Sequence, residues 1–344
     1  MPKQFTFIFL LFLLLTNNLF SQQFNNALEY LEFVSGEQEI ITRNTWKYTK
    51  AIAHSKRDRT IASKRNALIK SIERAITKIN KAQAFEGDKF KENVLKNLEL
   101  NKNLLQQDYA KVIDMKAVAE QSYDAMEAYM LAQEMEDKKM TEAQQEFEIH
   151  YYEFARKHDI KIIESETDLS KKMKISSDVF DHYNDLYLIF FKVNMNEVYL
   201  YDALERNNIS AIEQNAGALS ESAQEGLATL DTVSLYKKDR MLVDATRKAF
   251  EFFKDEADNK IPAITDYLIA SEDFEAIKSK LENTPERKRT KAQIDAYNKK
   301  VPLINKAVDD YNKTNATLNV KRETVIGNLN AAYERFLAKH IPKD

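Results

Sequence analysis

The stretch IDAYNKKVPLINKAVDDYNKTNATLNVKRETVIGNLNAAYERF, residues 294–336, decides how this chain folds. Read in alternating steps of three and four, it presents thirteen positions, and eleven of them are apolar when two tyrosines are counted. Such a repeat places the apolar side chains on one face of a helix that packs like a coiled coil. The thirteen positions, called the seam below, are Ile294, Tyr297, Val301, Ile304, Val308, Tyr311, Asn315, Leu318, Arg322, Val325, Leu329, Ala332 and Phe336.

A seam of this length indicates one very long helix or two nearly collinear ones. At 1.5 Å per residue, Thr290–His340 would span roughly 75 Å, with a bend expected at Pro302. The seam predicts a rod-shaped molecule. It can pair within the chain or with a second chain, and Asn315 could set the register in either case. The oligomeric state therefore stays open.

Composition extends this expectation to the rest of the chain. The 344 residues include only five Gly and five Pro, where average usage gives about 24 and about 17. A scarcity of turn residues favours few turns and long helices. The absence of cysteine excludes disulfides, thiolate metal sites and a lipid-modified N-terminal cysteine. The predicted fold is all-α, an elongated bundle of long antiparallel helices.

Other segments have the same helical period. Residues 66–84 and 90–112 predict a helical hairpin that turns at Glu86-Gly87-Asp88, with Asp88 as the N-cap of its second helix. Leu186–Tyr201 is apolar around most of its circumference, which is typical of the buried centre of a bundle. We expect one bundle half over residues 22–160 and a second over 161–344, packed together. An internal duplication that gives two stacked, similar bundles stays open as an alternative.

The N-terminus reads as an export signal. A lysine at position 3 precedes the eleven-residue apolar run Phe5–Leu15 and a polar stretch that ends at Ser21. About 20 residues are needed to span a bilayer, so residues 1–21 predict a cleaved signal peptide, with an uncleaved anchor as the alternative. No later segment reaches 18 consecutive apolar residues. We expect an exported protein that is periplasmic, displayed on the outer surface or secreted, with no transmembrane segment after cleavage.

Several local strings of the first 200 residues are distinctive. They are Ala27–Phe33, Trp46–Thr49, Ala51–His54, Gly87-Asp88, Asp108–Val112, Met115 and Ala119–Tyr129. Together they resemble an uncharacterised family of exported, all-helical bacterial surface proteins with no assigned activity. The resemblance implies export and a helical fold, but no mechanism. This chain lacks the lipoprotein-type cysteine.

One group of side chains predicts a metal site. Its members lie at i, i+3, i+4 and i+7, so a helix displays all of them on one side, and facing helices that bear such residues can bind a divalent cation. They are Asp178, Asp181, His182 and Asp185. A comparable stripe consists of Glu142, Glu146, His150 and Glu153. Neither stripe contains the Glu-x-x-His pair of di-iron bundles, and a solvated acidic face with a structural histidine is the competing interpretation.

Tyrosine density marks a candidate surface for a macromolecular partner. Tyrosine offers contact area and a hydroxyl group, although at helical spacing it also serves as ordinary packing. Tyr151 and Tyr152 are the candidate partner-binding residues. Basic clusters at 56–65 and 287–291 contain or adjoin acids, and the net charge of −3 argues against a nucleic-acid partner.

Motifs of common enzymes are missing from the sequence. It contains no GxGxxG, GxxxxGK[ST], GxSxG or HExxH. No cofactor is expected. The sequence predicts a non-enzymatic helical protein of the bacterial envelope or surface that binds or scaffolds a protein or envelope component. A metal-binding bundle built on carboxylates and histidine is the alternative.

Overall fold

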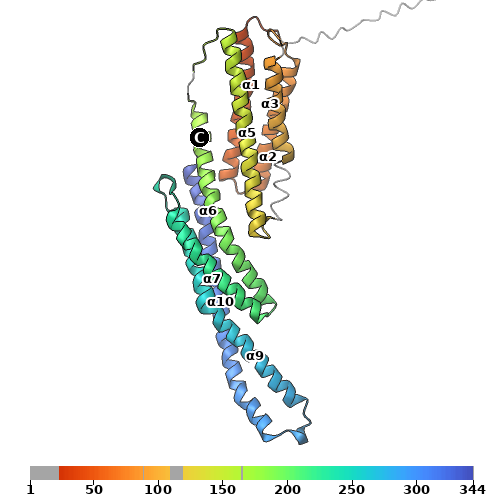
Figure 1. Ribbon diagram of the computed structural model, residues 1–344, viewed down its shortest axis with the longest axis vertical. Helices are drawn as coiled ribbons and strands as arrows, with labels where there is room; N and C mark the ends of the chain where they lie inside the picture. Colours follow the sequence, from red (N-terminus) through yellow and green to blue (C-terminus); the bar gives the residue numbers. More distant parts are fainter. Residues whose placement is uncertain (1–22, 88, 109–118, 164–165, 344) are drawn as a thin grey trace, which may run out of the picture.

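The computed structural model describes residues 23–87, 89–108, 119–163 and 166–343, and these ranges contain helices and turns but no β-strand. The prediction of an elongated, all-α bundle of long antiparallel helices is confirmed (Figure 1). The predicted signal peptide, residues 1–21, lies outside the described residues. Among the helices in these ranges, none combines the length and the apolarity that crossing a bilayer requires.

A first bundle occupies one end of the molecule (Figure 1). The large side chains at its centre include Tyr30, Leu68, Ile72 and Phe154. The second and third helices are the antiparallel neighbours that the sequence predicts, and their turn uses positive φ at Glu86 and Gly87, whereas Asp88 lies outside the described residues. The helices are α1 (Ala27–His54), α2 (Asp58–Lys81), α3 (Lys89–Asn103), continued by the π-helix η1 (Leu104–Asp108), and α5 (Tyr123–Lys157).

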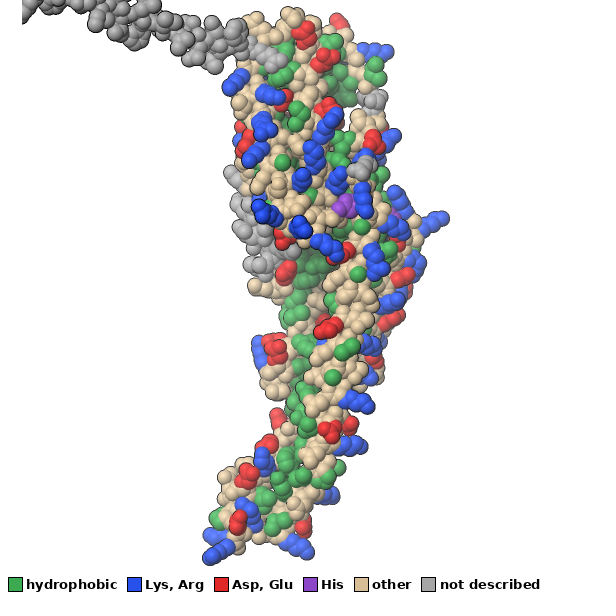
Figure 2. Space-filling model, turned by 180° about the vertical axis from the view of Figure 1, so that it is seen from behind, with side chains coloured by type: hydrophobic (Ala, Val, Ile, Leu, Met, Phe, Trp, Pro, Cys, Tyr) green, Lys and Arg blue, Asp and Glu red, His purple; other side chains and the backbone are tan. Residues whose placement is uncertain are grey.

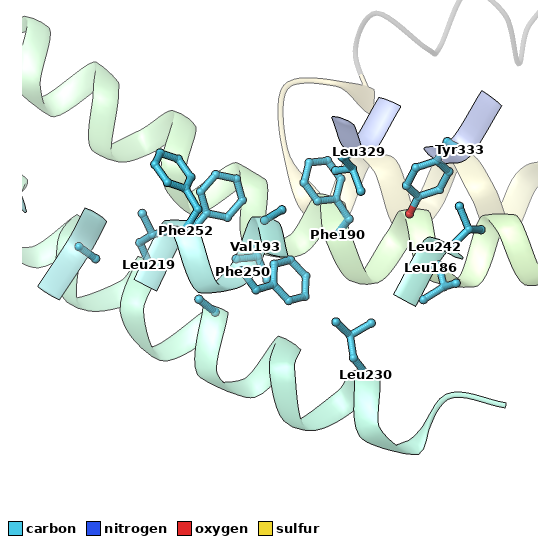
Figure 3. Close-up of a cluster of buried hydrophobic side chains, with 14 of the residues drawn as sticks. Leu186, Phe190, Val193, Leu219, Leu230, Leu242, Phe250, Phe252, Leu329 and Tyr333 are labelled. Atoms are coloured by element: carbon cyan, nitrogen blue, oxygen red, sulfur yellow. The ribbon is translucent and has the colours of Figure 1, made fainter. Parts of the chain in front are cut away.

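A second bundle follows and holds the larger core. Its centre contains aromatic and aliphatic side chains, among them Phe190, Phe250 and Phe252 (Figure 3). Trp46 of α1 also packs into this core, so the two bundles share a contact region. The bundle is built from α6 (Asp168–Glu205), α7 (Ile209–Thr232), the 3-10 turn η2 (Tyr236–Lys238), α8 (Met241–Asp255) and the C-terminal part of α10 (Lys291–His340).

The seam lies on one unbroken helix, which is the first of the two predicted possibilities. α10 has 50 residues, begins at a capping box between Thr290 and Gln293, and runs through Pro302. Its C-terminal part packs against α6 and α8, whereas its N-terminal part extends beyond the bundle (Figure 1).

Among the described residues, one other helix accompanies this N-terminal part of α10. The π-helix η3 (Glu256–Lys260) leads from α8 into α9 (Ile261–Glu282), and the short η4 (Glu286–Lys288) turns the chain into α10. α9 and α10 lie side by side to the end of the molecule (Figure 1). Residues 266–317, the projecting two-helix part, are called the arm below.

Candidate functional site

A cavity of about 630 Å³ lies between α6 and α7, and Tyr123 of α5 contributes to its wall. Its apolar lining comes from Leu188, Ile189, Val193 and Val233. Its polar lining carries hydroxyl groups and both signs of charge. These polar residues are His182, Asp185, Lys192, Ser222, Glu225, Thr229 and Ser234.

A glycine fixes the floor of this cavity. A Cβ atom added at Gly226 would lie 2.6 Å from a ring carbon of Phe250 and 3.1 Å from Cγ2 of Val193. Because real Cβ atoms essentially never come within 3.0 Å of a neighbour, glycine is what lets the ring of Phe250 pack directly on the backbone of α7. The floor therefore belongs to the buried core of the second bundle, whereas the rim carries exposed charged side chains.

The charged side chains at the rim form only weak ion pairs. Nζ of Lys192 lies 3.8 Å from Oε2 of Glu225, and the two side chains are 54% and 62% exposed. The same ammonium group lies 6.0 Å from the ring centre of Tyr123. Exposed ion pairs of this kind contribute at most about 1 kcal/mol, so both charges can turn toward a bound partner. Apolar walls with a rim of mixed charge suit an amphipathic segment of a macromolecule.

The four residues of the predicted metal stripe do not converge on one point. His182 packs against the rings of Phe336 and Tyr236, with centroids 5.4 and 6.3 Å away, and burial lowers its pKa. Asp181 faces the negative charge of Asp137 on α5; partial desolvation raises the pKa of both carboxyls, that of Asp137 to about 6.

Helical geometry explains this divergence. Asp181 and His182 are adjacent, so about 100° of rotation separates them, and they form opposite edges of the stripe. Asp185 lines the cavity together with His182, and the charges of Asp178 and Asp185 both contribute to the raised pKa of Asp181. Within the part of the chain that the structure describes, no three His, Asp or Glu side chains are placed to hold a metal ion. The arrangement gives the metal-binding alternative no support.

The two candidate partner-binding tyrosines have different surroundings. The hydroxyl group of Tyr151 lies 3.1 Å from Oγ of Ser35, and its ring packs 5.9 Å from that of Phe147, so it joins α5 to α1. Tyr152 packs edge-on against Tyr151 at 5.9 Å and is 42% exposed. Of the pair, Tyr152 presents the larger surface to solvent, on the first bundle and apart from the cavity.

A buried ionic cluster joins α6, η3 and α10. Nε of Arg322 donates to Oε1 of Glu197 at 2.6 Å, and Nη2 donates to Oε1 of Glu256. The guanidinium group also lies 4.1 Å from the ring centre of Tyr201, whose hydroxyl group donates to Glu256 at 2.9 Å. Burial raises the pKa of Glu197 to about 7 and also raises that of Glu256, which is fully buried. The cluster fixes the rotation of α10 against the second bundle.

Sequence reasoning did not find this cluster, although one signal was present. Arg322 is a charged exception within the apolar seam. A cation at a buried seam position requires a carboxylate from a facing helix. The two carboxylates that meet it lie 125 and 66 residues earlier in the chain, and the seam alone does not identify them.

A scan of protein-family models finds no family that matches this chain, and searches of curated proteins and of solved structures find no significant match. The resemblance to exported helical surface proteins thus stays a prediction from sequence.

Proposed function

We propose that this chain is an exported, non-enzymatic binding or scaffolding protein of the bacterial envelope or surface, and that the cavity between α6 and α7 receives a segment of its macromolecular partner. The observation that carries the proposal is the cavity itself, with an apolar floor and a rim that includes Lys192 and Glu225. Binding pockets are typically apolar with a few placed polar groups. The N-terminal sequence supports export.

The geometry at the rim also favours binding over catalysis. Its charged side chains are exposed and loosely paired, whereas a catalytic acid or base needs a fixed position and a tuned pKa. His182, the titratable group with the lowered pKa in this lining, is instead packed between aromatic rings. A site of this kind holds a partner through contact area and charge pairing.

Site-specific photo-crosslinking in the producing bacterium tests the proposal. A photoreactive phenylalanine analogue would replace Thr229, an exposed residue of the cavity lining. The matched control places the analogue at Gln224, which is also exposed on α7 but does not line the cavity. We expect a discrete envelope adduct from position 229 and none from position 224.

A second variant separates true occupancy from chance proximity. In an otherwise unchanged chain, Ser222→Trp would fill the cavity floor, and we expect it to abolish the adduct at position 229 while circular dichroism still shows a helical fold. Adducts of equal yield from positions 229 and 224, or an adduct that survives the filled cavity, would contradict the proposal. Export is tested independently by sequencing the N-terminus of the envelope-associated protein, which we expect to begin at Gln22.

A further inference from the structure

The arm is an incomplete helical bundle. The structure describes all of residues 266–317, and Ile304 is the single side chain in that range that is buried. Stacked aromatic pairs hold the two helices together, with centroids 4.4 Å apart for Tyr267 and Tyr311 and 5.5 Å apart for Phe274 and Tyr297. Two helices alone leave much of their shared seam open to water, whereas a four-helix bundle encloses it.

Apolar surface remains exposed on this arm. Ile294, Val301 and Val308 repeat every seven residues and therefore lie on one face of α10. Ile294 is 41% exposed, and the two valines are half-buried. Elsewhere on the arm Leu303 is 56% and Ile269 43% exposed. Figure 2 shows hydrophobic side chains along the length of the arm between charged edges.

Charge is segregated along the arm. Its tip half, residues 276–304, carries eight Lys or Arg and three Asp or Glu, a net charge of +5. The root half, residues 266–275 and 305–317, carries two Lys and six Asp or Glu, a net charge of −4. An identical arm laid alongside in the opposite direction places each basic tip beside an acidic root. In the same direction, like charges would meet.

We propose that the arm is a self-association surface, on which a second copy of this chain packs its own arm antiparallel to form a four-helix bundle. The two-fold axis would pass near Val301, so that Ile294 of each copy meets Val308 of the other. Asp309 and Asp310 then lie beside Lys291 of the second copy. This is an isologous contact, which closes as a dimer.

The size of the arm fits such a dimer. Its α10 part, residues 292–317, is about 39 Å long, and two adjacent helices are about 20 Å wide. One face therefore covers roughly 800 Å², which is the typical area per partner in a specific interface. The proposal uses a different surface from the cavity between α6 and α7, so either can fail without the other.

Sedimentation velocity of residues 22–344 tests the proposal. We expect a dimer at micromolar concentration in low salt, and a dissociation constant that rises with added NaCl because the charges at tip and root become screened. Val301→Glu would place two like charges at the two-fold axis and should raise that constant at least about tenfold. Val320→Glu changes an exposed residue of α10 outside the arm, 65% exposed, and should leave it unchanged.

A charge swap keeps the test independent of folding. Asp310→Lys should weaken the dimer, as should Lys291→Glu, and the two changes together should restore it. The proposal would be overturned if the protein stayed monomeric at concentrations about 100 times higher than the micromolar concentrations at which we expect the dimer. A dimer that is indifferent to Val301→Glu, or charge changes that do not compensate, would overturn it equally, since association would then use another face or direction.

Discussion

The two parts of α10 carry the same apolar repeat in different surroundings. From Leu318 onward the helix lies against the second bundle, and Leu329, Tyr333 and Phe336 are buried there. Before Leu318 the described structure places it beside α9, and Ile304 is the buried residue of the stretch 291–317. The periodicity of the sequence thus defines which face of a helix is apolar. The number of helices that cover this face depends on the rest of the chain.

The largest difference in stability between the two parts of α10 is expected when one large side chain in each part is truncated. Phe336→Ala empties a fully buried position and should lower the free energy of unfolding by about 4 kcal/mol. Leu303→Ala on the arm removes a side chain that is 56% exposed and should cost under about 1 kcal/mol. Urea unfolding of both variants, followed by circular dichroism, measures the contrast. Equal losses would mean that the arm is as well packed as the core.

The ionic cluster marks the boundary between the two parts. Arg322→Met leaves the carboxyls of Glu197 and Glu256 buried without their cation, which should cost about 3 kcal/mol. The loss should shrink as pH falls toward 5, because protonation removes the unpaired charges. Lys321→Met, beside it and 49% exposed, is the control and should change stability little. A similar effect from both changes would show that the cluster does not anchor the helix.

Replacing each of two glycines of α7 should give a smaller difference in stability, within the second bundle. Gly226→Ala inserts a Cβ atom against the ring of Phe250 and should cost about 2 kcal/mol through overpacking. At Gly217 the added Cβ atom meets nothing within 4 Å, so Gly217→Ala should stabilise the helix by about 0.5 kcal/mol. Thermal unfolding of the two variants would show shifts in opposite directions. Shifts of the same sign would contradict the packing described for the cavity floor.

The ionic cluster should also make stability depend on pH. Burial and the neighbouring Glu256 raise the pKa of Glu197 from 4.5 to about 7, although Arg322 acts in the opposite direction. The folded state therefore keeps a proton that the unfolded state has released, and the free energy of unfolding should fall as pH rises from about 4.5 to 7. Glu197→Gln should flatten this decline in urea unfolding at several pH values. If the free energy of unfolding of the variant fell with pH as steeply as that of the unchanged protein, other titratable groups would cause the pH dependence.

Much of the architecture could be predicted because it depends on local sequence. The seam indicated one long helix or two nearly collinear ones, the scarcity of Gly and Pro indicated few turns, and the sequence around Gly87 predicted a hairpin. Contacts between distant segments could not be predicted in this way. Arg322 meets Glu197 and Glu256 only through the relative rotation of three helices.

The predicted metal stripe is a second case in which contacts between distant segments could not be predicted from local sequence. A helical wheel places Asp181 and His182 on one side of α6. The neighbouring elements then give them different roles, one facing Asp137 and the other packed against Phe336. The cavity was not predicted as such, although two members of the stripe, His182 and Asp185, line it.

Hydrogen exchange along α10 at two protein concentrations tests most directly whether the arm is completed by a second copy. At low concentration we expect amides of residues 292–317 to exchange faster than those of residues 318–340. Raising the concentration should slow exchange in the first range and leave the second unchanged, because dimerisation covers only the arm. Equal protection of both ranges at low concentration, or no response of the arm to concentration, would contradict the account.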